Sequence, residues 1–133
     1  NFRMSKHDGK LRRNACVVGG ATILNFGITA VLKYSVGRER PFVTYTDIIN
    51  KSGKPCNDPS FPSGHTSTAF TLATSLSLEY PKWYVIVPAY TYASTVAYSR
   101  MHLGVHYPSD VLVGALIGSG CAYITHVVNK KLK

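Results

Sequence analysis

Apolar residues gather in four segments that polar or irregular stretches separate. Residues 15–32 and 111–128 contain no Lys, Arg, Asp or Glu, whereas residues 65–80 and 83–98 mix apolar positions with Ser, Thr and aromatic side chains. The segments suit helices, and none shows the strict alternation of a half-buried strand. The pattern therefore predicts an all-α fold, an antiparallel helical bundle of about four long helices.

Several helix ends are marked by the residues around them. Ser63 precedes the second segment as a typical N-cap, and Pro81 follows that segment. Pro-Ser-Asp at 108–110 opens the fourth segment, and Asn-Lys-Lys at 129–131 closes it with cations that suit a helix C-terminus. The longest irregular stretch, residues 37–62, is expected to form a lid over one end of the bundle.

Basic residues mark the two ends of the chain. Residues 1–13 form a basic N-terminal segment and residues 129–133 a basic C-terminal tail, and the whole of 1–133 has the length of a single domain. In an antiparallel arrangement both basic ends lie at one end of the bundle. The polar sequences that follow the first and third segments, and those that precede the second and fourth, then meet at the other end.

Membrane insertion is favoured over a soluble bundle. A span needs about 20 largely apolar residues, and only residues 15–32 and 111–128 approach that length. The formal net charge is +9, with basic residues flanking both segments, and the positive-inside tendency places the basic ends in the cytoplasm. The opposite end then faces the periplasm or exterior. A soluble four-helix core in a periplasmic or secreted protein is the alternative.

Three short motifs lie at that opposite end. A lone Lys-x6-Arg-Pro more often marks a solvated helix end, a lone Pro-Ser-Gly-His is an ordinary turn and cap, and the third motif alone can be a capped helix start. All three in this order at one end of a bundle indicate a site. They comprise Lys33, Arg40 and Pro41, then Pro62, Ser63, Gly64 and His65, and finally Ser99, Arg100, His106 and Asp110.

These residues suit the binding of a phosphate group. Lys33, Arg40 and Arg100 supply cations, and a guanidinium can hold two phosphate oxygens at once. Ser63 and Gly64 stand at a helix start, where backbone N–H groups point at an anion. Arg38 is interpreted as an extra, solvated loop cation.

Histidine is the favoured nucleophile, because the chain places no Cys in a phosphate-binding loop. Asp110, four positions after His106, is expected to accept a hydrogen bond from one ring nitrogen and leave the other free to attack phosphorus. His65 then serves as general acid for the leaving group and as base for water. No carboxylate has a recognisable metal-ligand spacing with two histidines, so no metal or other cofactor is expected. Nucleic-acid binding is disfavoured, since no basic and aromatic pattern or zinc-finger spacing is present.

The three motifs closely resemble the signature of the type 2 phosphatidic acid phosphatase superfamily, which includes lipid phosphatases, class A acid phosphatases and vanadium haloperoxidases. The resemblance implies the roles already assigned to His106, Asp110 and His65, and a phosphate held by the cations and the helix start. Membrane members of this family have six helices. This chain accommodates the last four, so two leading helices are expected to be missing.

The sequence predicts a metal-independent phosphatase that hydrolyses a lipid phosphate monoester or pyrophosphate through a phosphohistidine. Its expected partner is that phosphorylated lipid or another phosphomonoester. Two alternatives stay open: a soluble, secreted, non-specific acid phosphatase, and a membrane protein that binds phosphate in a catalytically idle pocket. The head group, the acyl chain and the oligomeric state are left open by the sequence.

Overall fold

The four apolar segments form four long helices in the computed structural model, which describes residues 2–132 and the side chains from residue 6 onward. A short helix lies in the connection after the first of them, and no strand occurs in the part described. The all-α antiparallel bundle is therefore confirmed. The helices are α1 (Phe2–Val36), α2 (Pro41–Thr44), α3 (Gly64–Glu79), α4 (Trp83–His102) and α5 (Pro108–Lys131).

The helix ends differ from the predicted ones where polar residues continue a helix. The basic segment before residue 15 belongs to α1, and the Lys, Arg and Leu residues that it contains are good helix formers. Helix α5 begins at Pro108, and the Asp110 side chain accepts a hydrogen bond from the Tyr107 amide at 2.8 Å, which caps the first turn. The capping residue of α5 is therefore also a candidate site residue.

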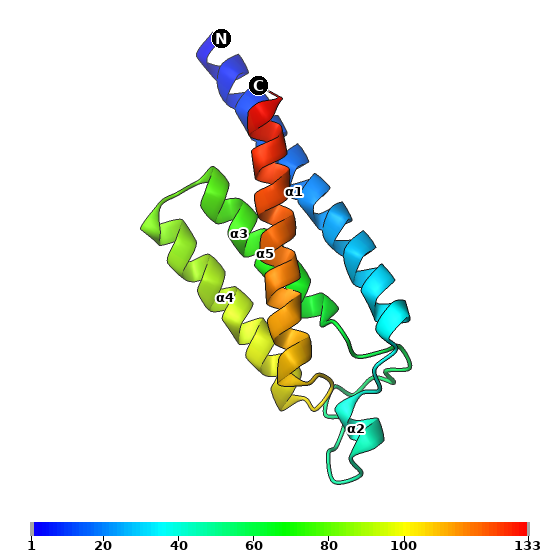
Figure 1. Ribbon diagram of the computed structural model, residues 1–133. Helices are drawn as coiled ribbons and strands as arrows, with labels where there is room; N and C mark the ends of the chain where they lie inside the picture. The colour runs from blue at the N-terminus through cyan, green and yellow to red at the C-terminus, as the bar shows by residue number, and fades with distance from the viewer. Residues whose placement is uncertain (1, 133) are drawn as a thin grey trace.

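Helix α3 packs against each of the other long helices, while α4 and α5 touch each other little (Figure 1). Small residues allow the close approach: Ala69 and Ala73 of α3 meet Ala93 of α4. Against α5 the approach is closer still, since a Cβ built on Gly114 would lie 2.7 Å from the Ser63 carbonyl oxygen. Helix α5 thereby lies against the start of α3, where the second motif begins.

Polar side chains join α1 to α3 inside the bundle. Asn25 is fully buried and donates to Thr68 Oγ1 at 3.4 Å, and the Thr29 and Ser67 hydroxyls lie 3.4 Å apart. Buried amides and hydroxyls need partners, and such pairs hold helices together in a bilayer as well as in a core. They fix the position of α1 along α3.

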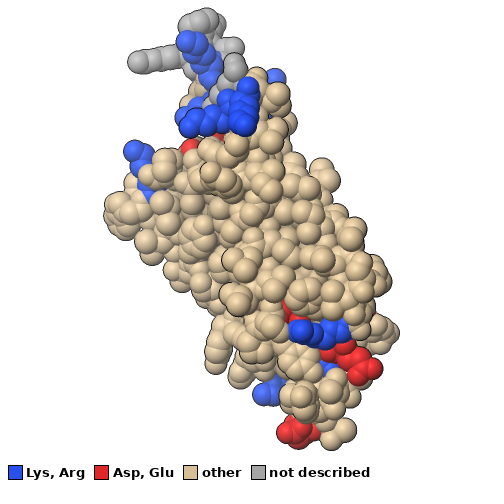
Figure 2. Space-filling model, viewed as in Figure 1, with Lys and Arg blue, Asp and Glu red and all other residues tan. Residues whose placement is uncertain are grey.

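The bundle has two polar ends and an apolar middle. Both termini lie at one end, and the connection from residue 37 to 62 covers the other (Figure 1). On the face shown in Figure 2, Lys, Arg, Asp and Glu gather toward the two ends. Two segments, Lys6–Thr44 and Pro108–Lys131, are long and apolar enough to cross a membrane. Their apolar side chains point outward, with Ile23 74% and Leu116 65% exposed.

Candidate active site

The three motifs meet at the end of the bundle opposite the termini (Figure 1). Antiparallel helices bring this about, because α1 and α4 end there while α3 and α5 begin there. The candidate residues lie as follows: Lys33 in the last turn of α1, Arg40 immediately before α2, Ser63, Gly64 and His65 at the start of α3, Arg100 in the last turn of α4, His106 in the connection to α5, and Asp110 in the first turn of α5.

His106 is buried, with 5% of its surface exposed, and both ring nitrogens have a neighbour. Nδ1 lies 2.8 Å from the Ser60 carbonyl oxygen. A carbonyl oxygen only accepts, so Nδ1 carries the hydrogen and Nε2 keeps its lone pair. Nε2 lies 3.3 Å from Arg40 Nη1 and accepts from it. The unprotonated nitrogen therefore faces a candidate phosphate-binding cation.

Asp110 does not take the hydrogen bond expected from the sequence. Its Oδ2 lies 3.7 Å from His106 Nδ1, which is an ion-pair distance, and the nearer acceptor for that nitrogen is the Ser60 carbonyl. The prediction of a direct hydrogen bond is corrected in this respect. A fully buried carboxylate at this distance still stabilises a positive charge that develops on the ring.

Arg38 was expected to be solvated, and this interpretation is wrong. Its Nη1 donates to Asp110 Oδ1 at 2.9 Å and to Ser109 Oγ at 2.6 Å. The guanidinium also lies over the rings of Phe61 and Tyr107, at 5.3 and 5.5 Å from their centroids. Arg38 therefore holds Asp110 in place. The only hint in the sequence is that a buried carboxylate needs a cation.

Asp58 bridges two of the candidate phosphate-binding cations. Its Oδ2 lies 2.9 Å from Lys33 Nζ, and its Oδ1 lies 2.9 Å from Arg40 Nη2. Burial alone would raise the pKa of Asp58, but the hydrogen bonds and positive charges of Lys33 and Arg40 lower it to about 2. Asp58 is therefore ionised at neutral pH, and it lies outside the three motifs that the sequence shows.

Backbone carbonyls hold the same two cations. Lys33 Nζ donates to the Pro59 carbonyl at 2.8 Å, while Arg40 donates through Nε to the Asp58 carbonyl at 3.1 Å and through Nη1 to the Val105 carbonyl at 3.0 Å. The connection between α2 and α3 therefore packs directly against the site. These carbonyls position the cations.

Arg100 and His65 complete the group of charged and titratable side chains. Arg100 Nε is buried and has no partner among the described residues. The pKa of His65 is lowered by partial burial and then by the positive charge of Arg100, with smaller effects from His106, Arg40 and Lys33. His65 therefore lies close enough to the other motif residues for their positive charge to act on it, and this charge favours its neutral form.

The start of α3 offers backbone donors to the same space. The Ser63 side chain accepts from the Thr66 amide at 3.4 Å, and the Ser63 amide donates to the Asp110 carbonyl at 3.1 Å. The amides of Gly64 and His65 have no carbonyl one turn before them in the helix. A Cβ on Gly64 would meet only Thr29 Cγ2, at 4.0 Å. The room beside Gly64 lets an anion approach these two amides.

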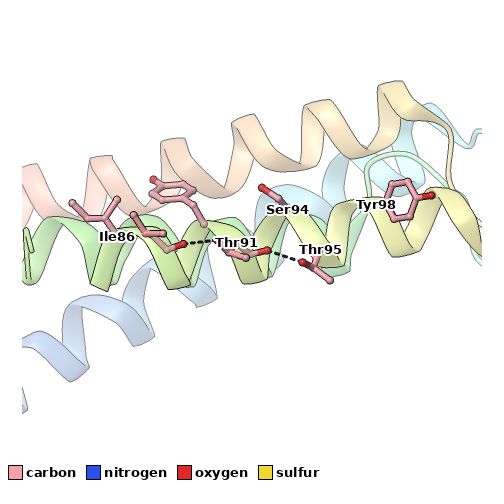
Figure 3. Close-up of a pocket in the computed structure, with 7 residues that line it drawn as sticks. Ile86, Thr91, Ser94, Thr95 and Tyr98 are labelled. Carbon is pink, nitrogen blue, oxygen red and sulfur yellow. Dashed lines mark hydrogen bonds between the residues drawn. The ribbon is translucent and has the colours of Figure 1, made fainter. Parts of the chain in front are cut away.

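A separate shallow groove of about 670 Å³ runs along α4 (Figure 3). No Lys, Arg, Asp, Glu or His lines it, so it is unsuited to binding a phosphate. Two of its hydroxyls are used within the helix, since Thr91 and Thr95 donate to the carbonyls of Val87 and Thr91 at 2.7 and 2.8 Å. The residues that line the groove are Ile86, Val87, Tyr90, Thr91, Ser94, Thr95 and Tyr98.

Comparison with known proteins places these observations in a family. The family model described as PAP2 superfamily matches residues 14–133. An undecaprenyl-diphosphatase from Sulfolobus acidocaldarius is 37% identical over 112 residues, which are 81% of this chain and 53% of that protein. A lipid A 1-phosphatase from Porphyromonas gingivalis is 42% identical over 95 residues, 69% of this chain and 18% of that protein. The chain spans about half of the first relative and less of the second.

Two solved structures have the same fold. The crystal structure of LpxE from Aquifex aeolicus superposes with a TM-score of 0.78 at 35% identity, covering 86% of this chain and 67% of that one. A transmembrane PAP2-type phosphatidylglycerolphosphate phosphatase from Bacillus subtilis superposes with a TM-score of 0.68 at 26% identity, covering 98% and 71%. Both agree with the four-helix bundle described above.

Proposed function

Since the chain belongs to the PAP2 superfamily, we propose that it is a metal-independent phosphatase acting on a lipid phosphate monoester or pyrophosphate through a phosphohistidine. The names of the relatives support the substrate class, because an undecaprenyl-diphosphatase and a lipid A 1-phosphatase are both named for lipids that carry phosphate. The apolar helices α1 and α5 support a membrane location, where such a substrate resides.

The main support for this proposal is the orientation of the His106 ring. The Ser60 carbonyl holds Nδ1–H, so the Nε2 lone pair points toward the Arg40 guanidinium. A phosphoryl group bound to that guanidinium would lie next to this nitrogen, which attacks phosphorus once its hydrogen bond from Arg40 Nη1 is broken. Catalysis of phosphoryl transfer depends mainly on such positioning and on charge stabilisation.

The reaction has two steps on this geometry. His106 Nε2 forms a bond to phosphorus while the bond from phosphorus to the leaving oxygen breaks, and His65 gives its proton to that oxygen. Water then attacks the phosphohistidine, His65 takes a proton from it, and inorganic phosphate leaves with His106 restored. Asp110, 3.7 Å from Nδ1, stabilises the charged ring between the steps.

His65 must carry a proton when the leaving group departs, although its pKa is lowered by partial burial and the surrounding cations. A bound phosphate dianion reverses part of this effect, since negative charge nearby raises the pKa of a histidine. In the proposed reaction, substrate binding therefore favours the protonated form of His65. In the proposed reaction Lys33, Arg40 and Arg100 supply the positive charge that a metal ion supplies in other phosphatases.

The central test compares His106→Ala with His7→Ala, an exposed histidine at the opposite end of the bundle. Purified protein in detergent is given lipid phosphates, lipid pyrophosphates and an aryl phosphate in the presence of a chelator, and released phosphate is measured. We expect release by the native chain and by His7→Ala, and none by His106→Ala, with unchanged helical content.

Other outcomes separate the alternatives. Full activity of His106→Ala would refute the nucleophile, and activity that disappears with chelator would refute metal independence. Phosphate binding without release from any substrate would instead indicate an idle pocket. Release from the aryl phosphate alone would contradict the lipid substrate class.

A further inference from the structure

We propose that the Asp58 carboxylate competes with the substrate phosphate for hydrogen-bond donors of Lys33 and Arg40. Asp58 binds these donors in the free protein, moves away when phosphate binds, and binds them again when phosphate leaves. The inference rests on the proposed phosphatase function. It adds a residue outside the three motifs that sets how tightly the site holds phosphate, both as substrate and as product.

The geometry of the bridge is the first argument. The two carboxylate oxygens are used separately, Oδ2 by Lys33 Nζ and Oδ1 by Arg40 Nη2, each at 2.9 Å. Two oxygens of one phosphate group present the same charge-assisted arrangement to an ammonium and a guanidinium. Asp58 therefore uses the donors that the proposed function assigns to the substrate.

The remaining bonds of the two cations show what displacement requires. Lys33 also donates to the Pro59 carbonyl, and Arg40 donates through Nε and Nη1 to the carbonyls of Asp58 and Val105. If the Asp58 side chain rotates away, one donor becomes free on each cation while these backbone contacts stay in place. The exchange needs a side-chain movement and leaves the fold of the loop intact.

Exposure indicates which partner moves. The Asp58 side chain is 47% exposed, whereas those of Lys33 and Arg40 are 14% and 7% exposed. The carboxylate can turn into water, where hydration compensates for the lost ion pairs. The buried cations stay behind with their carbonyl partners and meet the incoming anion.

Competition of this kind lowers the apparent affinity for phosphate by the fraction of molecules whose cations are free. It also speeds product release, because the carboxylate takes back the donors that inorganic phosphate vacates. A site with several fixed cations otherwise binds a multiply charged product tightly. Asp58 keeps its charge between about pH 5 and pH 9, so the competition is constant over that range.

The test compares Asp58→Asn with Asp47→Asn, which removes the same charge from an exposed position in the same connection. The inhibition constant of inorganic phosphate is measured against an aryl phosphate substrate, at low salt and at about 0.5 M salt, where long-range effects between exposed charges are screened. We expect Asp58→Asn to bind phosphate on the order of tenfold more tightly at both salt concentrations. Asp47→Asn should match the native chain at high salt.

Weaker or unchanged phosphate binding by Asp58→Asn would overturn the inference, because Asp58 would then only order the cations. An equal gain in Asp47→Asn would also overturn it, by showing a general charge effect. If the native chain is active and Asp58→Asn does not bind phosphate more tightly, the inference about Asp58 fails while the proposed function still stands. A native chain that hydrolyses no phosphate compound overturns both.

Discussion

At the scale of single residues, Asp110 illustrates how a buried charge is stabilised by residues far apart in the chain. Its side chain is fully buried and accepts from the Tyr107 amide and from Arg38. A carboxylate in such surroundings is destabilising unless its oxygens have donors or cations nearby. Arg38 therefore belongs with the motif residues in maintaining the site, although it binds no substrate in the proposed reaction.

Arg38→Ala is expected to lower the free energy of unfolding by about 1–2 kcal/mol, a value discounted because the Arg38 side chain is 38% exposed. Turnover should fall as well, because Asp110 and the ring beside it lose their fixed position. Thermal unfolding in detergent and phosphate release measure the two effects. Lys54→Ala, an exposed cation of the same connection, is the control and should change neither.

The His65→Gln variant tests whether His65 acts as the general acid or only binds phosphate. Removing a proton donor slows the departure of an alkoxide by about 10²–10⁴-fold. A nitrophenolate leaves without a proton, so hydrolysis of nitrophenyl phosphate should be affected far less. Steady-state rates with the two substrates measure this difference. An equal loss with both leaving groups would mean that His65 only binds phosphate.

The pH dependence follows from the same residue. Because partial burial and the nearby cations lower the pKa of His65, its protonated form is scarce in the free protein at neutral pH. For a lipid or alkyl phosphate, kcat/KM should therefore rise as the pH is lowered from about 8 toward about 6. For the nitrophenyl ester, whose leaving group needs no proton, the rate of the first step should not rise in this way. A flat profile for the alkyl ester would contradict the assigned acid.

The sequence reveals side chains with recognisable chemistry, but it does not reveal their backbone and loop partners. His106 and His65 are candidates because of their positions in the motifs. The Ser60 carbonyl could not be identified in this way, since every residue has a carbonyl, and its contact joins positions 46 residues apart. Asp58 and Arg38 were visible only as loop charges, because their partners depend on how the connection folds back over the bundle end.

At the scale of elements, the contact between α3 and α5 positions the second motif relative to the third. The Ser63 amide donates to the Asp110 carbonyl at 3.1 Å. This contact is possible because Gly114 has no side chain, as a Cβ there would lie 2.7 Å from the Ser63 carbonyl oxygen. The absence of a side chain in α5 is thus part of the site geometry.

Gly114→Ala should push α3 away from α5, lower the free energy of unfolding by about 1–3 kcal/mol and reduce turnover strongly. Gly120 lies in the same helix, and a Cβ added there would have no atom within 4 Å. Gly120→Ala should therefore be neutral or stabilising by up to about 1 kcal/mol, as expected for Gly to Ala in a helix. Thermal unfolding and phosphate release of the pair test this, and equal behaviour of the two variants would contradict it.

The apolar pattern predicted the helices better than it predicted their ends. Segments 15–32 and 111–128 were found because a long uninterrupted apolar run is typical of a buried or membrane-spanning helix. The extension of α1 back to Phe2 and the short α2 were not found. A charged helical extension has no apolar face to reveal it, and a helix of four residues is too short to show a helical period in its apolar residues.

At the scale of the whole molecule, native cysteines allow the orientation in the membrane to be measured. Cys56 is partly exposed in the connection at the motif end, Cys16 is exposed on the apolar part of α1, and Cys121 is buried. If the basic ends lie in the cytoplasm, as the positive-inside tendency predicts, a membrane-impermeant maleimide should label Cys56 in intact cells of a Cys16→Ala variant. A second variant with Cys16→Ala, Cys56→Ala and Lys130→Cys should be labelled only after lysis. The reverse pattern would place the site in the cytoplasm, and labelling of both in intact cells would argue against a spanning bundle.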